Sequence, residues 1–219
     1  MPQRDGAVGR MASFLRRLEQ RRLPVHVTPV TRSMVETISS KLAWPQGMVF
    51  RQLLKPQMTN TVLGLMGDKG ASFEPLLRNT ANPTVIRAGE QINVAPSKVE
   101  VELDGRLLPG YSPEDLISEL VAISGGELEL EVIRHDPGPS EPDMALFETL
   151  TDILRSVDSD GEPVPILLPG ATDARFFSRL GIQTYGYLPM RLPTDLEPSR
   201  LIHGPDERIP VDAITFGTE

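Results

Sequence analysis

Residues 98 to 107 read Lys-Val-Glu-Val-Glu-Leu-Asp-Gly-Arg-Leu, and apolar residues alternate with charged ones over most of this stretch. Such a period of two is typical of a strand that buries one face. Shortly afterwards comes Ser112-Pro-Glu-Asp115. A serine cap followed by proline at the first helical position indicates the start of a helix. The chain is therefore predicted to pass from a half-buried strand into a capped helix.

The neighbouring segments extend this pattern in both directions. Pro83–Arg87 alternates in the same way, and residues 88–91, Ala-Gly-Glu-Gln, suit a bend, so the two strands are predicted to be antiparallel neighbours. Apolar residues recur three or four apart over Asp5–Gln20, which indicates a helix. Glu127–Ile133 is predicted to be a third strand with one charged face. The order helix, strand, strand, helix, strand predicts an α+β ferredoxin-like unit that lacks its first strand.

The remaining segments suggest two domains. Thr31 is predicted to cap a helix that ends near Pro45, and residues 44–77 are predicted to form short helices interrupted by Pro and Gly. Beyond a proline-rich linker, helices alternate with strands, which suggests parallel α/β pairing. These helices are predicted at Met144–Val157 and Asp173–Leu180, and the strands at Val164–Leu168 and Ile182–Tyr187. The predicted domains are residues 1–139 and 140–219.

Composition limits the classes of protein to which the chain can belong. Its 219 residues are 39% hydrophobic, which is enough for a sizeable core. The net charge of −8 argues against a nucleic-acid or anionic-membrane partner. With no cysteine, disulfides and Cys-ligated zinc are excluded. No apolar run approaches the length of a membrane span or a signal peptide, so we expect a cytoplasmic protein.

Histidine is scarce in this sequence. Only His26, His135 and His203 are present, without a His-x-Asp, a His-Glu-x-x-His or a Glu-Glu pair. A hydrolytic metal site usually takes at least three protein ligands and a water. Taken alone, His203 is better explained as a surface or capping residue than as a ligand. The chain therefore contains at most part of a metal site.

Two stretches could bind an anion. The segment from Leu168 to Phe177 places Gly170 and Thr172 between a predicted strand and a predicted helix, where backbone N–H groups point outward. The alternative is that Thr172 or Asp173 only caps this helix. Asn93 and Arg106 are predicted on adjacent strands, and the Arg106 guanidinium could clamp a carboxylate, although an exposed strand arginine is more often only solvated.

Five blocks, in this order, together resemble the zinc-dependent aminoacylase and carboxypeptidase superfamily. This superfamily includes acetylornithine deacetylase, succinyl-diaminopimelate desuccinylase and the carboxypeptidase S type. The blocks are Asn79-Thr-Ala-Asn-Pro-Thr84, Gln91-Ile-Asn-Val-Ala-Pro96, Leu103-Asp-Gly-Arg-Leu-Leu-Pro-Gly110, Gly170-Ala-Thr-Asp-Ala-Arg175 and His203-Gly-Pro-Asp-Glu-Arg208.

The resemblance implies a fold and a set of roles. Residues 1–139 would be the dimerisation, or lid, domain, with a helical insertion at 44–77 like that of the carboxypeptidase S type. Residues 140–219 would be the C-terminal part of the α/β zinc-peptidase catalytic domain. By motif position His203 would be a zinc ligand. Asn93 and Arg106 would grip the substrate carboxylate, and Gly170 and Thr172 would face the substrate.

The resemblance also implies a function. The chain would be the C-terminal portion of a metal-dependent hydrolase that cleaves amide bonds in N-acyl amino acids or peptides. The first metal-binding half of the superfamily has no counterpart here, so the isolated chain is expected to be inactive and not to bind zinc tightly. Expected partners are a second copy, bound through the lid, or a missing N-terminal catalytic half.

The alternative is a non-catalytic dimerisation or interaction module derived from the lid, because an edge is left unpaired where the first strand is missing. If the hydrolase interpretation holds, His203 and the loop from Gly170 to Thr172 should lie at one end of the remaining catalytic sheet. Arg106 should lie far from both.

Overall fold

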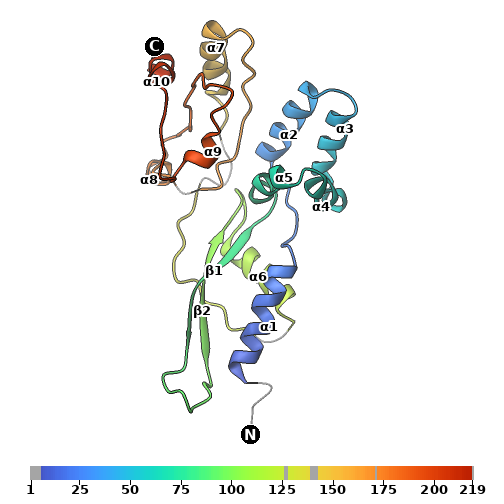
Figure 1. Cartoon of the computed structure of the whole chain (residues 1–219), viewed down its shortest axis with the longest axis vertical. Coiled ribbons are helices and arrows are strands. Elements are labelled where there is room, and N and C mark those ends of the chain that lie inside the picture. Colours follow the sequence, from blue (N-terminus) through green and yellow to red (C-terminus); the bar gives the residue numbers. More distant parts are fainter. Residues whose placement is uncertain (1–5, 126–127, 139–142, 171, 219) are drawn as a thin grey trace.

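The computed structural model describes residues 6–125, 128–138, 143–170 and 172–218. It is an α+β structure with a two-stranded antiparallel sheet (Figure 1). Strand β1 (Thr80–Ala88) pairs with β2 (Val99–Arg106), from Thr80 opposite Arg106 at one end to Ala88 opposite Val99 at the other. The predicted antiparallel strand pair is confirmed.

Two helices pack with the sheet around one apolar cluster. Helix α1 (Ala7–Gln20) and helix α6 (Pro113–Ser124) supply most of its buried side chains. Ser112 caps α6 as predicted: its hydroxyl accepts from Asp115 N at 3.3 Å, and the Asp115 carboxylate accepts from Ser112 N at 2.8 Å. We call this the lid cluster, and its buried members are Phe14, Leu23, Leu116, Leu120 and Ile123.

The predicted short helices over residues 44–77 are also confirmed. They are α3 (Gln46–Arg51), α4 (Pro56–Leu65) and α5 (Asp68–Phe73), with 3-10 turns at Gln52–Leu54 and Glu74–Leu76. Together with α2 (Pro29–Lys41) they enclose a second core, which we call the insertion cluster. Its buried members are Met34, Val35, Phe50, Leu53, Val62, Leu63, Leu76 and Leu77.

One cap was predicted wrongly. Thr28, not Thr31, caps α2, and its side chain accepts from Thr31 N. Pro29 is the first residue of the helix. Proline is tolerated there because the N–H that it lacks would have no hydrogen-bond acceptor within the helix. Thr31 lies inside the helix at 1% exposure, and its hydroxyl donates to Leu76 O at 2.8 Å.

The third predicted strand is not formed over the described residues 128–133. Its alternation is nevertheless kept, because Leu128 and Leu130 pack against the lid cluster while Glu129 and Glu131 are exposed. A strand also needs a neighbour that takes up its N–H and C=O groups. No such neighbour is present beside this segment in the described structure.

The C-terminal part is helical, and the two strands predicted there are wrong. It contains α7 (Phe147–Val157), α8 (Ala174–Arg179), α9 (Pro198–Leu201) and α10 (Val211–Thr218). The described residues of Val164–Leu168 and Ile182–Tyr187 form no ladder, and apolar side chains such as Ile166 and Ile182 stay at least half exposed. Parallel strands need buried neighbours on both sides, and this part of the chain offers none.

In Figure 1 the hairpin and α1 occupy one end of an elongated molecule, and the insertion helices and α7 to α10 occupy the other. The predicted domain boundary at residue 139 lies outside the described residues. No described helix is both long enough and apolar enough to cross a bilayer.

Candidate functional site

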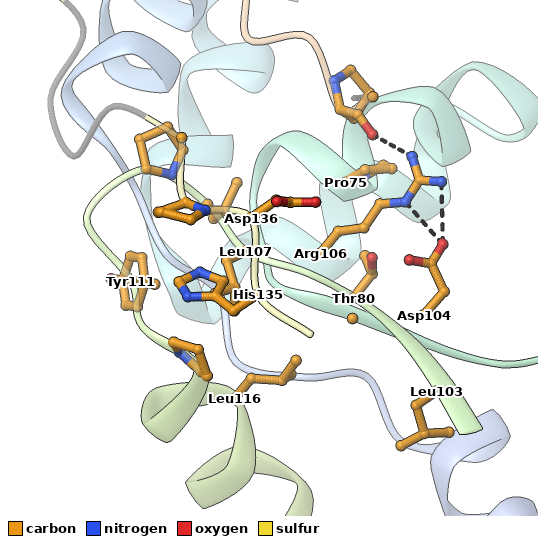
Figure 2. A pocket seen from close by; sticks show the side chains of 18 of the residues that line it. Pro75, Thr80, Leu103, Asp104, Arg106, Leu107, Tyr111, Leu116, His135 and Asp136 are labelled. Carbon is orange, nitrogen blue, oxygen red and sulfur yellow. Dashed lines mark hydrogen bonds and ion pairs between the residues drawn. The ribbon is translucent and has the colours of Figure 1, made fainter. Parts of the chain in front are cut away.

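Arg106 lies at the end of β2 and reaches across to the C-terminal part (Figure 2). Its Nη1 donates to Pro169 O at 2.7 Å, and its Nε and Nη2 each donate to Asp104 Oδ2 at 3.2 Å. A guanidinium has five N–H donors, so two remain unused within the described structure. With a side chain 53% exposed, Arg106 has the donors and the access needed to hold a carboxylate.

Arg106 was expected to lie far from the Gly170–Thr172 loop, and this expectation is wrong. Pro169, whose carbonyl accepts the Arg106 bond, directly precedes Gly170. The segment before it forms no strand ladder, so the Pro169 carbonyl is free to accept from a side chain. The structure therefore brings Arg106 and the start of this loop together.

Gly170 and Thr172 are both exposed, and Ala171 between them lies outside the described residues. The Thr172 hydroxyl accepts from Ala174 N at 3.3 Å, at the first residue of α8. Asp173, not Thr172, is the N-cap residue of α8, and its side chain makes no capping bond. The Thr172 contact therefore belongs to the turn that precedes the helix. A role for either residue in contacting substrate stays a prediction.

Asn93 lies apart from Arg106. It is an exposed residue of the loop that joins β1 to β2, beyond the Ala88 and Val99 pair, whereas Arg106 is at the opposite end of the hairpin. Val99 and Arg106, the two ends of β2, are separated by seven residue-to-residue intervals of ~3.4 Å, which is about 24 Å. The expectation that Asn93 sits on a strand adjacent to Arg106 is wrong, and a role for Asn93 in holding a substrate carboxylate stays a prediction.

His203 is exposed in the turn that follows α9, with a positive φ of 62°. Among the described residues, no group of three or more His, Asp or Glu side chains is placed to hold a metal ion. A hydrolytic zinc site needs at least three protein ligands. The donors described here therefore do not fit a zinc site by themselves, and the assignment of His203 as a ligand stays a prediction.

A buried polar network that no sequence motif indicated lies beside Arg106. Asn79, at 1% exposure, donates to Glu119 Oε1 at 3.1 Å and accepts from Leu108 N at 2.9 Å. His26 Nε2 lies 2.6 Å from the same Glu119 oxygen, and the His26 ring packs on Tyr111. The network links α6 to the segment just after β2, so it fixes the backbone from which Arg106 projects.

A second missed feature is Asp136, which three arginines approach. Its carboxylate pairs with Arg134 at 2.6 Å, with Arg175 at 3.8 Å and with Arg179. Desolvation raises the pKa of Asp136, but hydrogen bonds from Arg134 and Arg179 outweigh it and lower the pKa overall. Arg175 and Arg179 are four apart on α8, a spacing that puts both on one helix face. This spacing is the signal that could have indicated the contact.

Comparison with known proteins identifies the family. The family described as the peptidase dimerisation domain matches residues 2–130, more than half of the chain. The chain belongs to this family. The matched residues 2–130 include the sheet, both apolar clusters, the polar network and Arg106. Gly170, Thr172 and His203 lie outside the matched range.

Full-length relatives agree with this assignment. The chain is 28% identical over 219 residues to the N-fatty-acyl-amino acid synthase/hydrolase PM20D1 of Xenopus tropicalis. The aligned region covers 98% of this chain and 42% of the relative. The human protein of the same name is 26% identical over 223 residues, covering 97% and 43%. The probable carboxypeptidase S-like 2 of Dictyostelium discoideum is 24% identical over 216 residues, covering 96% and 40%.

These matches confirm the resemblance to the zinc-dependent aminoacylase and carboxypeptidase superfamily. The chain spans about two-fifths of the length of these curated relatives. No solved structure matches this chain.

Proposed function

We propose that this chain is the C-terminal portion of a metal-dependent hydrolase that cleaves amide bonds in N-acyl amino acids or peptides. The observation that carries the proposal is the nearly complete match of this chain to only about two-fifths of each full-length hydrolase. The names of the Xenopus tropicalis and human relatives favour an N-fatty-acyl amino acid as the substrate. The isolated chain is proposed to be inactive.

The structural support for inactivity is the state of residues 143–218. This part has helices but no described strand, and many of its apolar side chains are exposed. His203 has no described set of co-ligands. The other metal ligands and the general base would have to come from a polypeptide outside this chain. What this chain would supply is a substrate-binding group, Arg106, on a rigid strand end.

The experiment that tests this proposal compares the pure chain with an assembled enzyme. The pure chain, supplied with zinc and an N-fatty-acyl amino acid, is expected to release no amino acid above the buffer rate. Coexpression with the N-terminal part of the Xenopus tropicalis relative is expected to give hydrolysis that a chelator abolishes. Chelator-sensitive turnover by the pure chain would contradict the proposed inactivity.

Arg106 gives a sharper prediction in the assembled enzyme. Arg106→Lys is expected to raise the KM for an N-acyl amino acid by about tenfold, because a lysine cannot hold a carboxylate with two parallel N–H bonds. The KM for the matching N-acyl amine, which has no carboxylate, should not change. The control is Arg87→Lys, since Arg87 is also an exposed strand arginine but pairs with Glu102 near the other end of the hairpin. An equal rise in KM for both substrates would contradict the proposal that Arg106 binds the substrate carboxylate.

A second candidate function is a non-catalytic dimerisation or interaction module. The observation that favours it is that the matched family is itself a dimerisation domain and covers both strands of the described sheet. The same coexpression experiment separates the two functions. A stable dimer by light scattering, with no hydrolysis in any combination, would favour this module over the hydrolase.

A further inference from the structure

The Asp104 carboxylate holds one edge of the Arg106 guanidinium. A single oxygen, Asp104 Oδ2, accepts from both Nε and Nη2 of Arg106 at 3.2 Å (Figure 2). The remaining nitrogen, Nη1, donates to Pro169 O at 2.7 Å. All three nitrogens of Arg106 are therefore held by two acceptors of this chain.

The geometry of β2 brings Asp104 and Arg106 together. Residues two apart on a strand project from the same face, and both of these lie in the ladder with β1. Gly105 between them faces α6, since a Cβ added there would lie 2.8 Å from Leu116 Cδ2. Asp104 and Arg106 therefore share the face of β2 that points away from α6. Their contact needs no rearrangement of the backbone, so it exists before a substrate arrives.

Two N–H groups of Arg106 stay free within the described structure, one on Nη1 and one on Nη2. Each of these nitrogens carries two hydrogens and donates one of them here. A carboxylate can accept from two guanidinium N–H groups at once. A substrate carboxylate could therefore bind Arg106 without displacing Asp104.

Two opposite effects of Asp104 on such binding can be compared. Holding a long, flexible arginine in advance favours binding, because rotamer freedom that is already lost is not lost again when the ligand arrives. Repulsion between the Asp104 carboxylate and a substrate carboxylate opposes binding. This repulsion is weak, because the Asp104 side chain is 46% exposed and water screens exposed charges. The advantage of holding Arg106 in place should therefore be the larger effect.

We propose that Asp104 is a positioning residue, which holds the Arg106 guanidinium so that its free Nη1 and Nη2 donors receive the carboxylate of an N-acyl amino acid. The proposal rests on the proposed function, in which Arg106 binds that carboxylate. Asp104 acts through Arg106 and does not touch the substrate. Its role requires an acceptor oxygen rather than a negative charge, because Oδ2 alone accepts both bonds.

The first test measures KM and kcat in the enzyme assembled with the N-terminal part of the Xenopus tropicalis relative. Asp104→Ala is expected to raise the KM for an N-acyl amino acid about three- to tenfold. The KM for the matching N-acyl amine, which has no carboxylate, should not change. The kcat for the acid should also stay the same, because the contact is made equally in the bound substrate and the transition state.

Two further variants separate the acceptor from the charge. Asp104→Asn keeps one acceptor oxygen in place, so its KM for the acid should stay within about twofold of the parent value. Glu102→Ala is the matched control, since Glu102 lies two residues earlier on β2 and pairs with Arg87 instead. It should change neither KM. Urea unfolding should show that all three variants remain folded.

The second test uses nuclear magnetic resonance of the isotope-labelled pure chain and needs no hydrolysis. The Nε–H signal of Arg106 is identified by its absence in Arg106→Lys. Its exchange with water should be equally slow in the parent chain and in Asp104→Asn. In Asp104→Ala the exchange should be about fivefold faster, because the bond that protects this hydrogen is lost.

Several results would overturn the proposal. A lower KM for the acid in Asp104→Ala would mean that Asp104 competes with the substrate for Arg106. An unchanged KM, or an equal rise in KM for acid and amine, would remove the positioning role. A rise in Asp104→Asn equal to that in Asp104→Ala would mean that the charge is required.

The two tests also distinguish this proposal from the proposed function. An assembly that hydrolyses no substrate refutes the proposed function, and the exchange rates then decide whether Asp104 holds Arg106. Exchange that is equally slow in Asp104→Ala and the parent chain overturns the positioning role, even in an active assembly.

Discussion

Leu53→Ala is expected to lower the free energy of unfolding by ~2–5 kcal/mol. Leu53 has 0% exposure in the middle of the insertion cluster, between α3 and α4. Removing its side chain loses apolar burial and leaves a cavity among helices too short to be stable without packing. Urea unfolding followed by circular dichroism measures the change, and a fall in the apparent denaturant slope would show that the insertion now unfolds separately.

The matched control is Leu65→Ala, because Leu65 ends α4 in the same insertion but is 75% exposed. It should change the free energy of unfolding by no more than ~0.5 kcal/mol. If the two variants were equally stable, the insertion cluster would not be the packed core described here.

Asn79→Ala is expected to lower the free energy of unfolding by ~2–4 kcal/mol. The Asn79 carboxamide is buried, and its loss would leave Leu108 N–H without an acceptor and remove a donor from Glu119. Each buried group left unsatisfied costs about 1–3 kcal/mol. Thermal and urea unfolding both measure this change.

Asn82→Ala is the matched control, since Asn82 lies three residues further along on β1 and is exposed. It should stay within ~0.5 kcal/mol of the parent chain. Hydrogen exchange adds a second measurement. The Leu108 amide should lose protection in Asn79→Ala and keep it in Asn82→Ala, and unchanged protection in both would mean that this amide does not depend on the Asn79 side chain.

The sequence predicted the hairpin, α1 and α6 because the information for them is local. Period-two alternation gave β2, and the capping residues Ser112 and Asp115 gave the start of α6. The three predicted strands that failed show the same alternation or apolar runs. Alternation decides which face is buried, but a ladder needs a neighbour, and that neighbour is not among the described residues.

The candidate site was predictable to a smaller extent. The motif around Arg106 indicated an exposed guanidinium at a strand end, which the structure shows. Its contact with Pro169 joins residues 63 apart, and the bond of His26 to Glu119 joins residues 93 apart. Neither separation leaves a local signal, so His26 looked isolated in the sequence although its ring is part of a buried network.

The cluster around Asp136 sets how the chain should respond to its solvent. One carboxylate holds α8 to the segment 134–136 through the guanidinium groups of a half-buried Arg175 and an exposed Arg179, so this attachment is ionic. Added salt shortens the screening length from about 8 Å at physiological strength to about 3 Å at 1 M and weakens such pairs. The two apolar clusters are not weakened in this way, and sulfate or phosphate strengthens apolar burial. High salt should therefore loosen α8 while the lid cluster and the insertion cluster remain packed. Ionic strength can thus release one part of the molecule without denaturing the rest.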